Sequence, residues 1–424
     1  MVRDTCRVSA PIRVPARTEI LVVGAGPGGS AAAAAAAAAG HEVTLLDSAV
    51  FPRDKTCGDG LTPRAIAELD LLGLADAFNG PRIEGLDLQG WGGRQQVRWP
   101  QKSAHFPAYG SAVARTELDD RIRHHALDAG ATMVSGVKAV GATIIGGKVT
   151  AVQCNTPDGP AQIEVDKVIV ADGVRSALGT SLGRSWHRNT AYGVAARAYV
   201  ESGRCDDTWM GSHLELRDGG GELLPGYGWV FPLGAESGLV NIGVGALATE
   251  KRPAHMALRP IIEHYTNSQR DDWQLRGKPL RIASALLPMG GAVSGVAGAN
   301  WMLIGDAAAC VNPLNGEGID YALETARLAV EVLGENDYST LWPDLLRARY
   351  ALAFSAARRL AAVLTVPRVV PILGRPGIRS AALMSMVVRV MGNLITEDDS
   401  DLIARAWHLA GLTSNKLDTR PPFT

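Results

Sequence analysis

Three glycines near the start of the chain have the spacing of a dinucleotide-binding turn. Gly24, Gly26 and Gly29 form G-x-G-x-x-G. In such a turn the first glycine permits a sharp bend, the second lets the backbone approach a pyrophosphate, and the third lets a helix pack against the preceding strand. Asp47 follows at the distance where a carboxylate can accept hydrogen bonds from ribose hydroxyls. This spacing predicts a dinucleotide site, with an ordinary glycine turn of an α/β protein as the alternative.

The elements around these glycines are those that such a site needs. An apolar run at 20–23 predicts a buried strand, the alanines at 31–39 predict a helix, and 43–46 predict a second strand. The helix N-terminus would aim free N–H groups and a partial positive charge at a phosphate. The residues predicted to bind cofactor here are Gly24, Ala25, Gly26, Pro27, Gly28, Gly29 and Asp47.

Two more polar sites follow predicted buried strands. Asp172-Gly173 ends a strand at 168–171, and Gly305-Asp306 ends a strand at 301–304. The carboxyl ends of parallel strands face the ligand crevice, so Asp306 could accept hydrogen bonds from sugar-alcohol hydroxyls. Beyond it, N–H groups around Gly318 and Ile319 could face an electron-rich ring edge at the start of a helix. One mononucleotide-type turn with a distant second site favours FAD over NAD.

Other residues have chemistry but an open role. Cys57 lies in a long glycine-containing loop that could touch a bound ring, or it fills a small apolar space. Thr62 is predicted to cap the helix that begins at Pro63. Arg115, at a loop-to-helix junction, is either a surface charge or a phosphate contact. The segment 227–231 places three aromatic side chains on one face of a strand, which is either a sheet face under a helix or a pocket wall.

The composition limits the function classes. The 424 residues allow two or three domains, and the net charge of −1 argues against nucleic acid as a partner. The five cysteines are dispersed without a C-x-x-C pair, which suggests a reducing cytoplasm, and no histidine or cysteine spacing indicates a metal site. The N-terminus has no signal-peptide pattern, and no apolar stretch is long enough to predict a membrane span.

The patterns predict an α/β, or α+β, chain with a Rossmann-like nucleotide domain, an inserted antiparallel β-sheet and C-terminal helices, and the resemblance described next implies that it is a two-domain flavoprotein with an FAD domain and a substrate domain. The predicted parts are a flexible tail at 1–17, a discontinuous FAD-binding domain at 18–82, 107–189 and 283–333, a substrate domain at 83–106 and 190–282, and a helical region at 334–424.

The three glycine-acid signals together resemble the FAD-dependent class that includes p-hydroxybenzoate hydroxylase. Within that class the chain is similar to the geranylgeranyl reductase family, through FPRDKTCGDGLTPRA, PGYGWVFPLG, LLPMGG and IGDAAACVNPLNGEGIDYALETA. YGSAVAR, SHLELR and the closing RPPF resemble its branch of actinobacterial menaquinone reductases. Asp47 departs from the glutamate of many relatives, so its contact with ribose could be weaker or bridged by water.

The resemblance implies roles for these residues. The first turn would hold the ADP half of FAD, the Gly305-Asp306 site the ribityl chain and flavin edge, and Arg115 would contact the cofactor. Cys57, Tyr227 and Trp229 would be catalytic, with Cys57 as proton donor or flavin-side contact. Phe231 and Pro232 would line the substrate pocket. The further residues implied in cofactor binding are Gly58, Arg115, Asp172, Gly173, Asp306, Gly316, Gly318 and Ile319.

The implied reaction is saturation of an isoprenoid C=C bond, in one isoprene unit of the menaquinone side chain, by hydride transfer from reduced flavin. NAD(P)H is a possible reductant. The alternatives are reduction of another prenyl lipid, an FAD-dependent aromatic or quinone monooxygenase, and a flavoprotein that binds prenyl lipid without reducing it. Because such substrates reside in a bilayer, we expect peripheral attachment to the inner face of the membrane through helices at 360–395. The sequence leaves the oligomeric state open.

Overall fold

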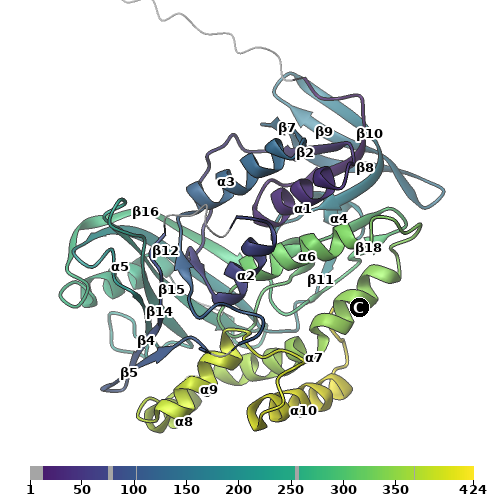
Figure 1. The fold of residues 1–424 in the computed structure, drawn as a ribbon. Helices are drawn as coiled ribbons and strands as arrows, with labels where there is room; N and C mark the ends of the chain where they lie inside the picture. Colours follow the sequence, from purple (N-terminus) through teal and green to yellow (C-terminus); the bar gives the residue numbers. More distant parts are fainter. Residues whose placement is uncertain (1–12, 75–79, 102, 254–256, 367) are drawn as a thin grey trace, which may run out of the picture.

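The chain folds into two β-sheets and a group of C-terminal helices (Figure 1). The structure is a computed structural model that describes residues 13–74, 80–101, 103–253, 257–366 and 368–424. Most of the predicted N-terminal tail therefore lies outside the described residues.

The first sheet has the order β18-β19-β10-β1-β2-β7, and β9 and β8 extend it from β10. Its strands β19, β10, β1, β2 and β7 pair in parallel, with β7 at the edge. The segments 20–23, 43–46, 168–170 and 301–303 are almost entirely buried, as parallel strands covered by helices on both faces require, whereas β7 is partly exposed. The strands are β1 (Arg17–Val23), β2 (Val43–Asp47), β7 (Thr132–Ser135), β8 (Lys138–Ile145), β9 (Lys148–Thr156), β10 (Gly159–Val170), β18 (Ala297–Gly298) and β19 (Trp301–Leu303).

Helices cover this sheet, and the N-terminal ends of several of them lie at the candidate site. The small alanine side chains of α1 let it lie close to both α3 and α6 (Figure 1). The elements here are α1 (Pro27–Ala38), α2 (Pro63–Leu71), α3 (Arg115–Asp128), α4 (Ala177–Ser181), the 3₁₀ helix η2 (Gly305–Ala308) and α6 (Ile319–Glu331). Short strand pairs join β3 (Gly60–Leu61) to β6 (Ser111–Ala112) and β11 (Ser185–Trp186) to β17 (Val293–Ser294).

The second sheet has the order β16-β12-β15-β14-β13-β4-β5, and α5 (Leu258–Ser268) packs on it. The strands are β4 (Gly85–Gly90), β5 (Gly93–Arg98), β12 (Tyr192–Ser202), β13 (Trp209–His213), β14 (Gly226–Pro232), β15 (Leu239–Ala248) and β16 (Leu275–Leu287). The prediction of an antiparallel sheet is wrong at one pair, because β4 and β13 run parallel. No hairpin connects these two strands in the chain, so the connection does not force them to be antiparallel.

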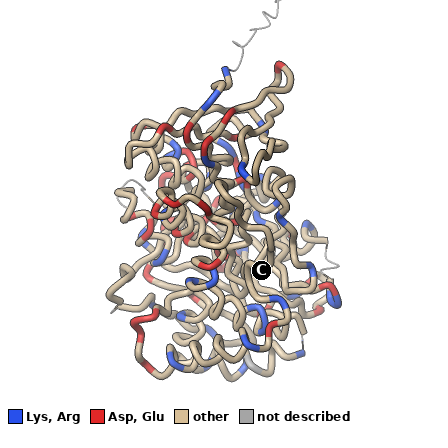
Figure 2. The backbone as a smooth tube through the Cα atoms, turned by 90° about the vertical axis from the view of Figure 1, so that its right-hand side faces the viewer, with Lys and Arg blue, Asp and Glu red and all other residues tan. Residues whose placement is uncertain are grey.

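The chain ends in four helices at the lower end of the molecule in Figure 1: α7 (Leu341–Leu364), α8 (Val369–Gly377), α9 (Ala381–Met391) and α10 (Leu402–Leu417). Asp401 caps α10 by accepting hydrogen bonds from the N–H groups of Ile403 and Ala404. Within the described part of the chain, no helix is both long and apolar enough to cross a bilayer. Acidic and basic residues are intermixed along the backbone in Figure 2, as expected from the net charge of −1.

The predicted domain division stays a prediction. The second sheet takes its strands from the two segments assigned to the substrate domain, but β16 continues to Leu287, past the predicted boundary at 282. Thr62 is the N-cap residue of α2, as predicted, yet its side chain makes no capping hydrogen bond. Its hydroxyl instead donates to Glu317, in the loop before α6.

Candidate active site

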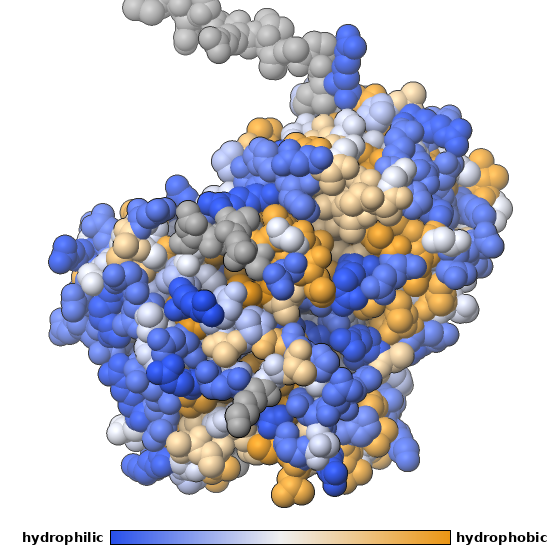
Figure 3. Space-filling model, in the orientation of Figure 1, coloured by the Kyte–Doolittle hydropathy of each residue, from blue (hydrophilic) through white to orange (hydrophobic). Residues whose placement is uncertain are grey.

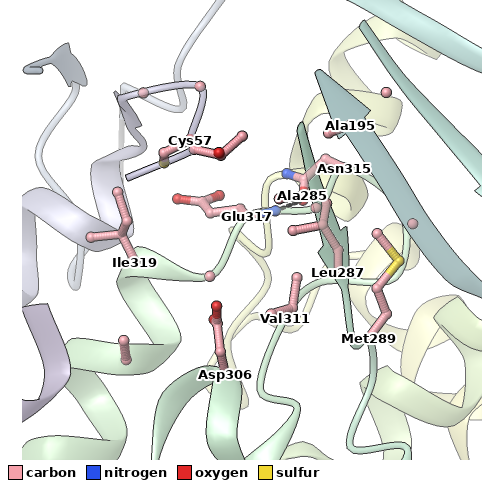
Figure 4. A pocket seen from close by; sticks show the side chains of 18 of the residues that line it. Cys57, Ala195, Ala285, Leu287, Met289, Asp306, Val311, Asn315, Glu317 and Ile319 are labelled. Atoms are coloured by element: carbon pink, nitrogen blue, oxygen red, sulfur yellow. Dashed lines mark hydrogen bonds between the residues drawn. The ribbon is translucent and has the colours of Figure 1, made fainter. Parts of the chain in front are cut away.

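A cavity of about 1100 Å³ extends from the glycine turn, past the Cys57 loop and β14, to the C-terminal helices. Its walls come from both sheets, from the loop 312–318 and from α7 to α10. Figure 4 shows its central part, where Cys57 and Glu317 lie on one side and Leu287 and Met289 on the other. The predicted site residues, far apart in sequence, are mostly brought together here.

At two positions of the glycine turn, the neighbouring backbone leaves no room for a side chain. Gly24 has φ +103°, and a Cβ there would lie 2.2 Å from the oxygen of Ala171. A Cβ at Gly29 would lie 1.7 Å from the oxygen of Gly24, which explains why α1 can start so close to β1. Neither position can carry a side chain without moving the backbone.

Gly26 is different because its surroundings are open. The nearest atoms to a Cβ there would be guanidinium nitrogens of Arg53, at 3.5 Å, and Arg115, at 3.9 Å. Arg115 is buried and donates from Nε and Nη2 to the carboxylate of Asp119, at 2.6 and 2.8 Å, and Arg53 Nη1 lies 2.9 Å from the same carboxylate. The prediction that Arg115 could be a surface charge is therefore wrong. Two arginines and the N-terminus of α1 make this an anion site suited to a pyrophosphate.

Asp47 is held at the end of β2 by two backbone donors. Its Oδ2 accepts from the N–H of Ala25 at 2.7 Å, and its Oδ1 from the N–H of Ala49 at 2.8 Å. Asp47 lines the cavity, whereas Ala25 is fully buried behind it. A carboxylate fixed in this way keeps lone pairs for ribose hydroxyls.

The second polar cluster lies across the cavity. Figure 4 shows the carboxylate of Asp306 pointing into the cavity below Glu317. Gly316, Gly318 and Ile319 also line it, and Gly318 is the N-cap of α6. Asp172 accepts from the N–H of Leu178 at 3.0 Å, and its other oxygen, Oδ1, is buried and has no hydrogen-bond partner among the residues that the structure describes. These acceptors and helix N–H groups suit a polyhydroxyl chain and a ring edge.

The Cys57 loop is anchored by a buried polar network that the sequence did not reveal. Asn241 donates from Nδ2 to the oxygen of Cys57 and to Oδ2 of Asp59, both at 2.8 Å. Tyr199 also donates to Asp59 Oδ2, at 2.7 Å, and Trp229 Nε1 donates to Asn241 Oδ1, at 2.9 Å. Burial raises the pKa of Asp59 to about 6, although these hydrogen bonds oppose the rise. The loop that carries Cys57 is thus tied to the second sheet.

The aromatic residues of β14 form one wall of the cavity. Ring centroids are 5.8 Å apart for Tyr227 and Trp229, and 6.2 Å for Trp229 and Phe231. Gly243 on β15 makes room for the indole, because a Cβ there would lie 2.1 Å from Trp229. A Cβ at Gly58 would lie 3.3 Å from the ring of Phe231, so this loop packs closely against the aromatic wall. Pro232, at the end of β14, is buried and lies outside the cavity lining, in contrast to its predicted role.

Sequence reasoning missed Arg53, Asp59, Asn241 and Glu317 as site residues. Asn241 was open to recognition as a single polar side chain inside the apolar strand VNIGVGA, and Asp59 stood within the quoted CGDG loop. Arg53 and Glu317 are ordinary charged residues of loops, and only the fold places them in the cavity.

An adenine dinucleotide with a polyhydroxyl arm and a flat ring fits these groups in order. The open backbone at Gly26 with two arginines suits the pyrophosphate, Asp47 the ribose, Asp306 the ribityl chain, and the Cys57 loop with β14 the ring. Fold and site together define an FAD-dependent oxidoreductase.

Comparison with known proteins identifies the family. Residues 17–226 match the FAD binding domain family. The chain is 58% identical over 410 residues to the menaquinone reductase of Mycobacterium tuberculosis strain H37Rv. This match covers 96% of this chain and 98% of the relative. It is 30% identical to digeranylgeranylglycerophospholipid reductase 1 of Methanopyrus kandleri, over 82% and 90% of the two chains. The chain therefore belongs to the geranylgeranyl reductase family of FAD-dependent oxidoreductases, in its menaquinone reductase branch.

A solved structure shows the same fold. The geranylgeranyl bacteriochlorophyll reductase-like protein of Thermoplasma acidophilum superimposes with a TM-score of 0.70 at 21% identity, over 94% of this chain and 96% of that one.

Proposed function

We propose that the protein saturates a C=C bond in the isoprenoid side chain of menaquinone with reduced FAD. The observation that supports this most is the continuous cavity between the cofactor site and the C-terminal helices. Its far end is lined by apolar residues of those helices: Leu360, Met384, Val387, Val390, Met391 and Trp407. A prenyl chain offers no polar handle, so a long apolar cavity is the means by which a protein can bind it.

The reaction depends more on where the protein holds the C=C bond than on any chemical activation of that bond. An isolated double bond has no carbonyl to polarise, and reduced FAD, when bound, supplies the hydride for one of its carbons. The chain must hold the bond in a near-attack geometry, which can contribute up to ~7–11 kcal/mol. It must also exclude water and supply a proton for the second carbon.

We assign these tasks to the residues around the Cys57 loop. Tyr227, Trp229 and Phe231 form the wall against which the double bond would lie, and an aromatic face can ease developing positive charge by roughly 0.5–2 kcal/mol. Cys57 is the proposed catalytic contact at the ring, as proton donor or as a flavin-side neighbour. NAD(P)H is a candidate for the reductant that reloads the flavin.

We further propose that the protein docks on the inner face of the membrane through its C-terminal helices. Exposed apolar side chains gather there, with Ile372 70% exposed, Leu402 82%, Leu409 64% and Leu417 65%. Figure 3 shows apolar atoms at this lower end of the molecule. The exposed arginines Arg368, Arg375 and Arg379 lie on and next to α8, the helix of Ile372, and a helix with both apolar and basic residues suits an anionic bilayer surface.

A second substrate class follows from the relatives. One relative named as a digeranylgeranylglycerophospholipid reductase matches 82% of this chain at 30% identity. The apolar cavity suits any prenyl chain, so the head group decides between these lipids.

Mass spectrometry of menaquinone from producing cells, with and without this protein, tests the proposal. We expect a tail heavier by two hydrogen atoms only when the protein is present. An unchanged menaquinone with an altered prenyl phospholipid would favour the second class, and a tail carrying an added oxygen would favour a monooxygenase.

A further inference from the structure

Glu317 is a cavity residue with no assigned role. It lies in the loop before α6, and Figure 4 shows its carboxyl group in the cavity beside Cys57. Thr62 Oγ1 donates to its Oε1 at 2.6 Å. The second oxygen, Oε2, is enclosed and has no hydrogen-bond partner among the described residues. A carboxylate would leave a charged oxygen unpaired there, whereas a carboxylic acid would carry its proton on that oxygen.

The groups around Glu317 favour the protonated form. Burial raises the pKa of Glu317 well above its ordinary value, and the neighbouring carboxyl of Asp320 raises it further. Hydrogen bonding with Thr62 and the charge of Arg64 oppose this rise, but Arg64 Nη2 is paired at 2.5 Å with Glu324. Polar groups that line this part of the cavity include Thr62, the thiol of Cys57, the phenol of Tyr227, the side chain of Asp306, and Asn315, whose Oδ1 accepts from the N–H of Glu317 at 2.9 Å. The unpartnered oxygen and the raised pKa of Glu317 together favour a neutral acid beside the reacting region.

The other proton carriers nearby are less suited to give up a proton. Burial raises the pKa of Cys57 above its ordinary value, and the nearby Arg115 opposes this rise only in part, so the thiol holds its proton more tightly than a free thiol does. Tyr227 donates its hydroxyl proton to the oxygen of Asn315 at 2.5 Å, and burial raises its pKa as well. Both protons are weakly acidic, and the proton of Tyr227 is already engaged.

We propose that Glu317 is the catalytic acid that protonates the carbon of the double bond opposite the carbon that receives the hydride. The proposal rests on the proposed function. The step balances, because reduced FAD provides one hydrogen with both electrons, Glu317 provides one proton, and the C=C bond becomes a CH–CH bond. Glu317 is left as a carboxylate and regains a proton from solvent that enters the cavity.

Glu317→Gln tests the assignment, because glutamine keeps the acceptor for Thr62 but cannot give a proton. Holoenzyme with chemically reduced FAD is mixed with menaquinone without oxygen, then exposed to air, and the tail mass is measured over time. We expect side-chain saturation to fall by about 10²–10⁴-fold, with FAD affinity unchanged. Glu331→Gln is the matched control on the exposed face of α6, and it should behave as wild type.

An infrared measurement gives a readout independent of turnover. The difference spectrum between wild type and Glu317→Gln at neutral pH should contain the carbonyl stretch of a protonated carboxylic acid that shifts in D₂O. A carboxylate band in its place, or wild-type rates in Glu317→Gln, would overturn the assignment. Failure of the wild type itself to saturate the tail would instead refute the proposed function.

Discussion

Cys57 lies between the groups suited to bind FAD and the proposed reacting region. Substitution at Cys57 can therefore test catalysis separately from cofactor binding. Its backbone oxygen is held by Asn241, while its side chain faces the cavity and Arg115. The groups suited to grip FAD are elsewhere, at Gly26, Asp47 and the arginines. Loss of the thiol should therefore slow the reaction and leave FAD binding unchanged.

We expect Cys57→Ala to retain FAD at wild-type stoichiometry and to lose most of its side-chain reductase activity, because the contact at the reacting ring is removed. Flavin absorbance of the purified protein and tail mass after reaction measure the two effects. Full activity in Cys57→Ala would remove Cys57 from the mechanism.

At the scale of elements, the sequence predicted those parts of the site whose residues are close together in the chain. It did not predict hydrogen bonds between residues that are far apart in the chain. The strand, glycine turn and helix of α1 were predictable because their pattern is local, and the strand of three aromatic residues was predictable from its period of two. The Asp59–Asn241 hydrogen bond joins residues 182 positions apart, and the Thr62–Glu317 bond joins residues 255 apart. No local pattern marks such pairs: the first forms where the Cys57 loop meets the second sheet, and the second forms where α2 and α6 pack together.

The glycine turn permits a matched test of its two functions. Gly24→Ala should destabilise the fold by several kcal/mol, because φ is +103° and the Cβ would lie 2.2 Å from a backbone oxygen. Gly26→Ala should leave the unfolding free energy within about 1 kcal/mol of wild type but weaken FAD binding, because its Cβ meets only side-chain ends and occupies the path to the pyrophosphate. Denaturant unfolding of the apoprotein and FAD titration distinguish the two. Equal FAD affinity in Gly26→Ala would contradict the pyrophosphate placement.

At the scale of the whole molecule, the cavity connects a cofactor site in one sheet to helices at the opposite end of the chain. The C-terminal helices were predicted from their pattern, but their place as the end wall of the cavity was not. A lipid tail that enters through them would reach the flavin without passing through water.

Membrane docking through these helices predicts a selective loss of binding. Replacing Leu402, Leu409 and Leu417 of α10 by serine should reduce sedimentation with phosphatidylglycerol vesicles by more than about tenfold, since each buried leucine contributes ~1.5–3 kcal/mol. Serine at Val50 and Leu71, which are 71% and 68% exposed elsewhere on the protein, serves as the control. Equal loss in both variants, or full release of the wild type by salt alone, would argue against an apolar docking face.

The central claim is that the isoprenoid tail, and not the quinone ring, receives the hydrogen atoms. The most direct measurement is the mass of menaquinone after anaerobic incubation with purified holoenzyme carrying reduced FAD, followed by reoxidation in air. Air returns a reduced ring to the quinone, so ring reduction leaves no change in mass. We predict a product heavier by two hydrogen atoms, with the gain located in the tail by fragmentation; a product of unchanged mass, with the flavin oxidised, would contradict the account.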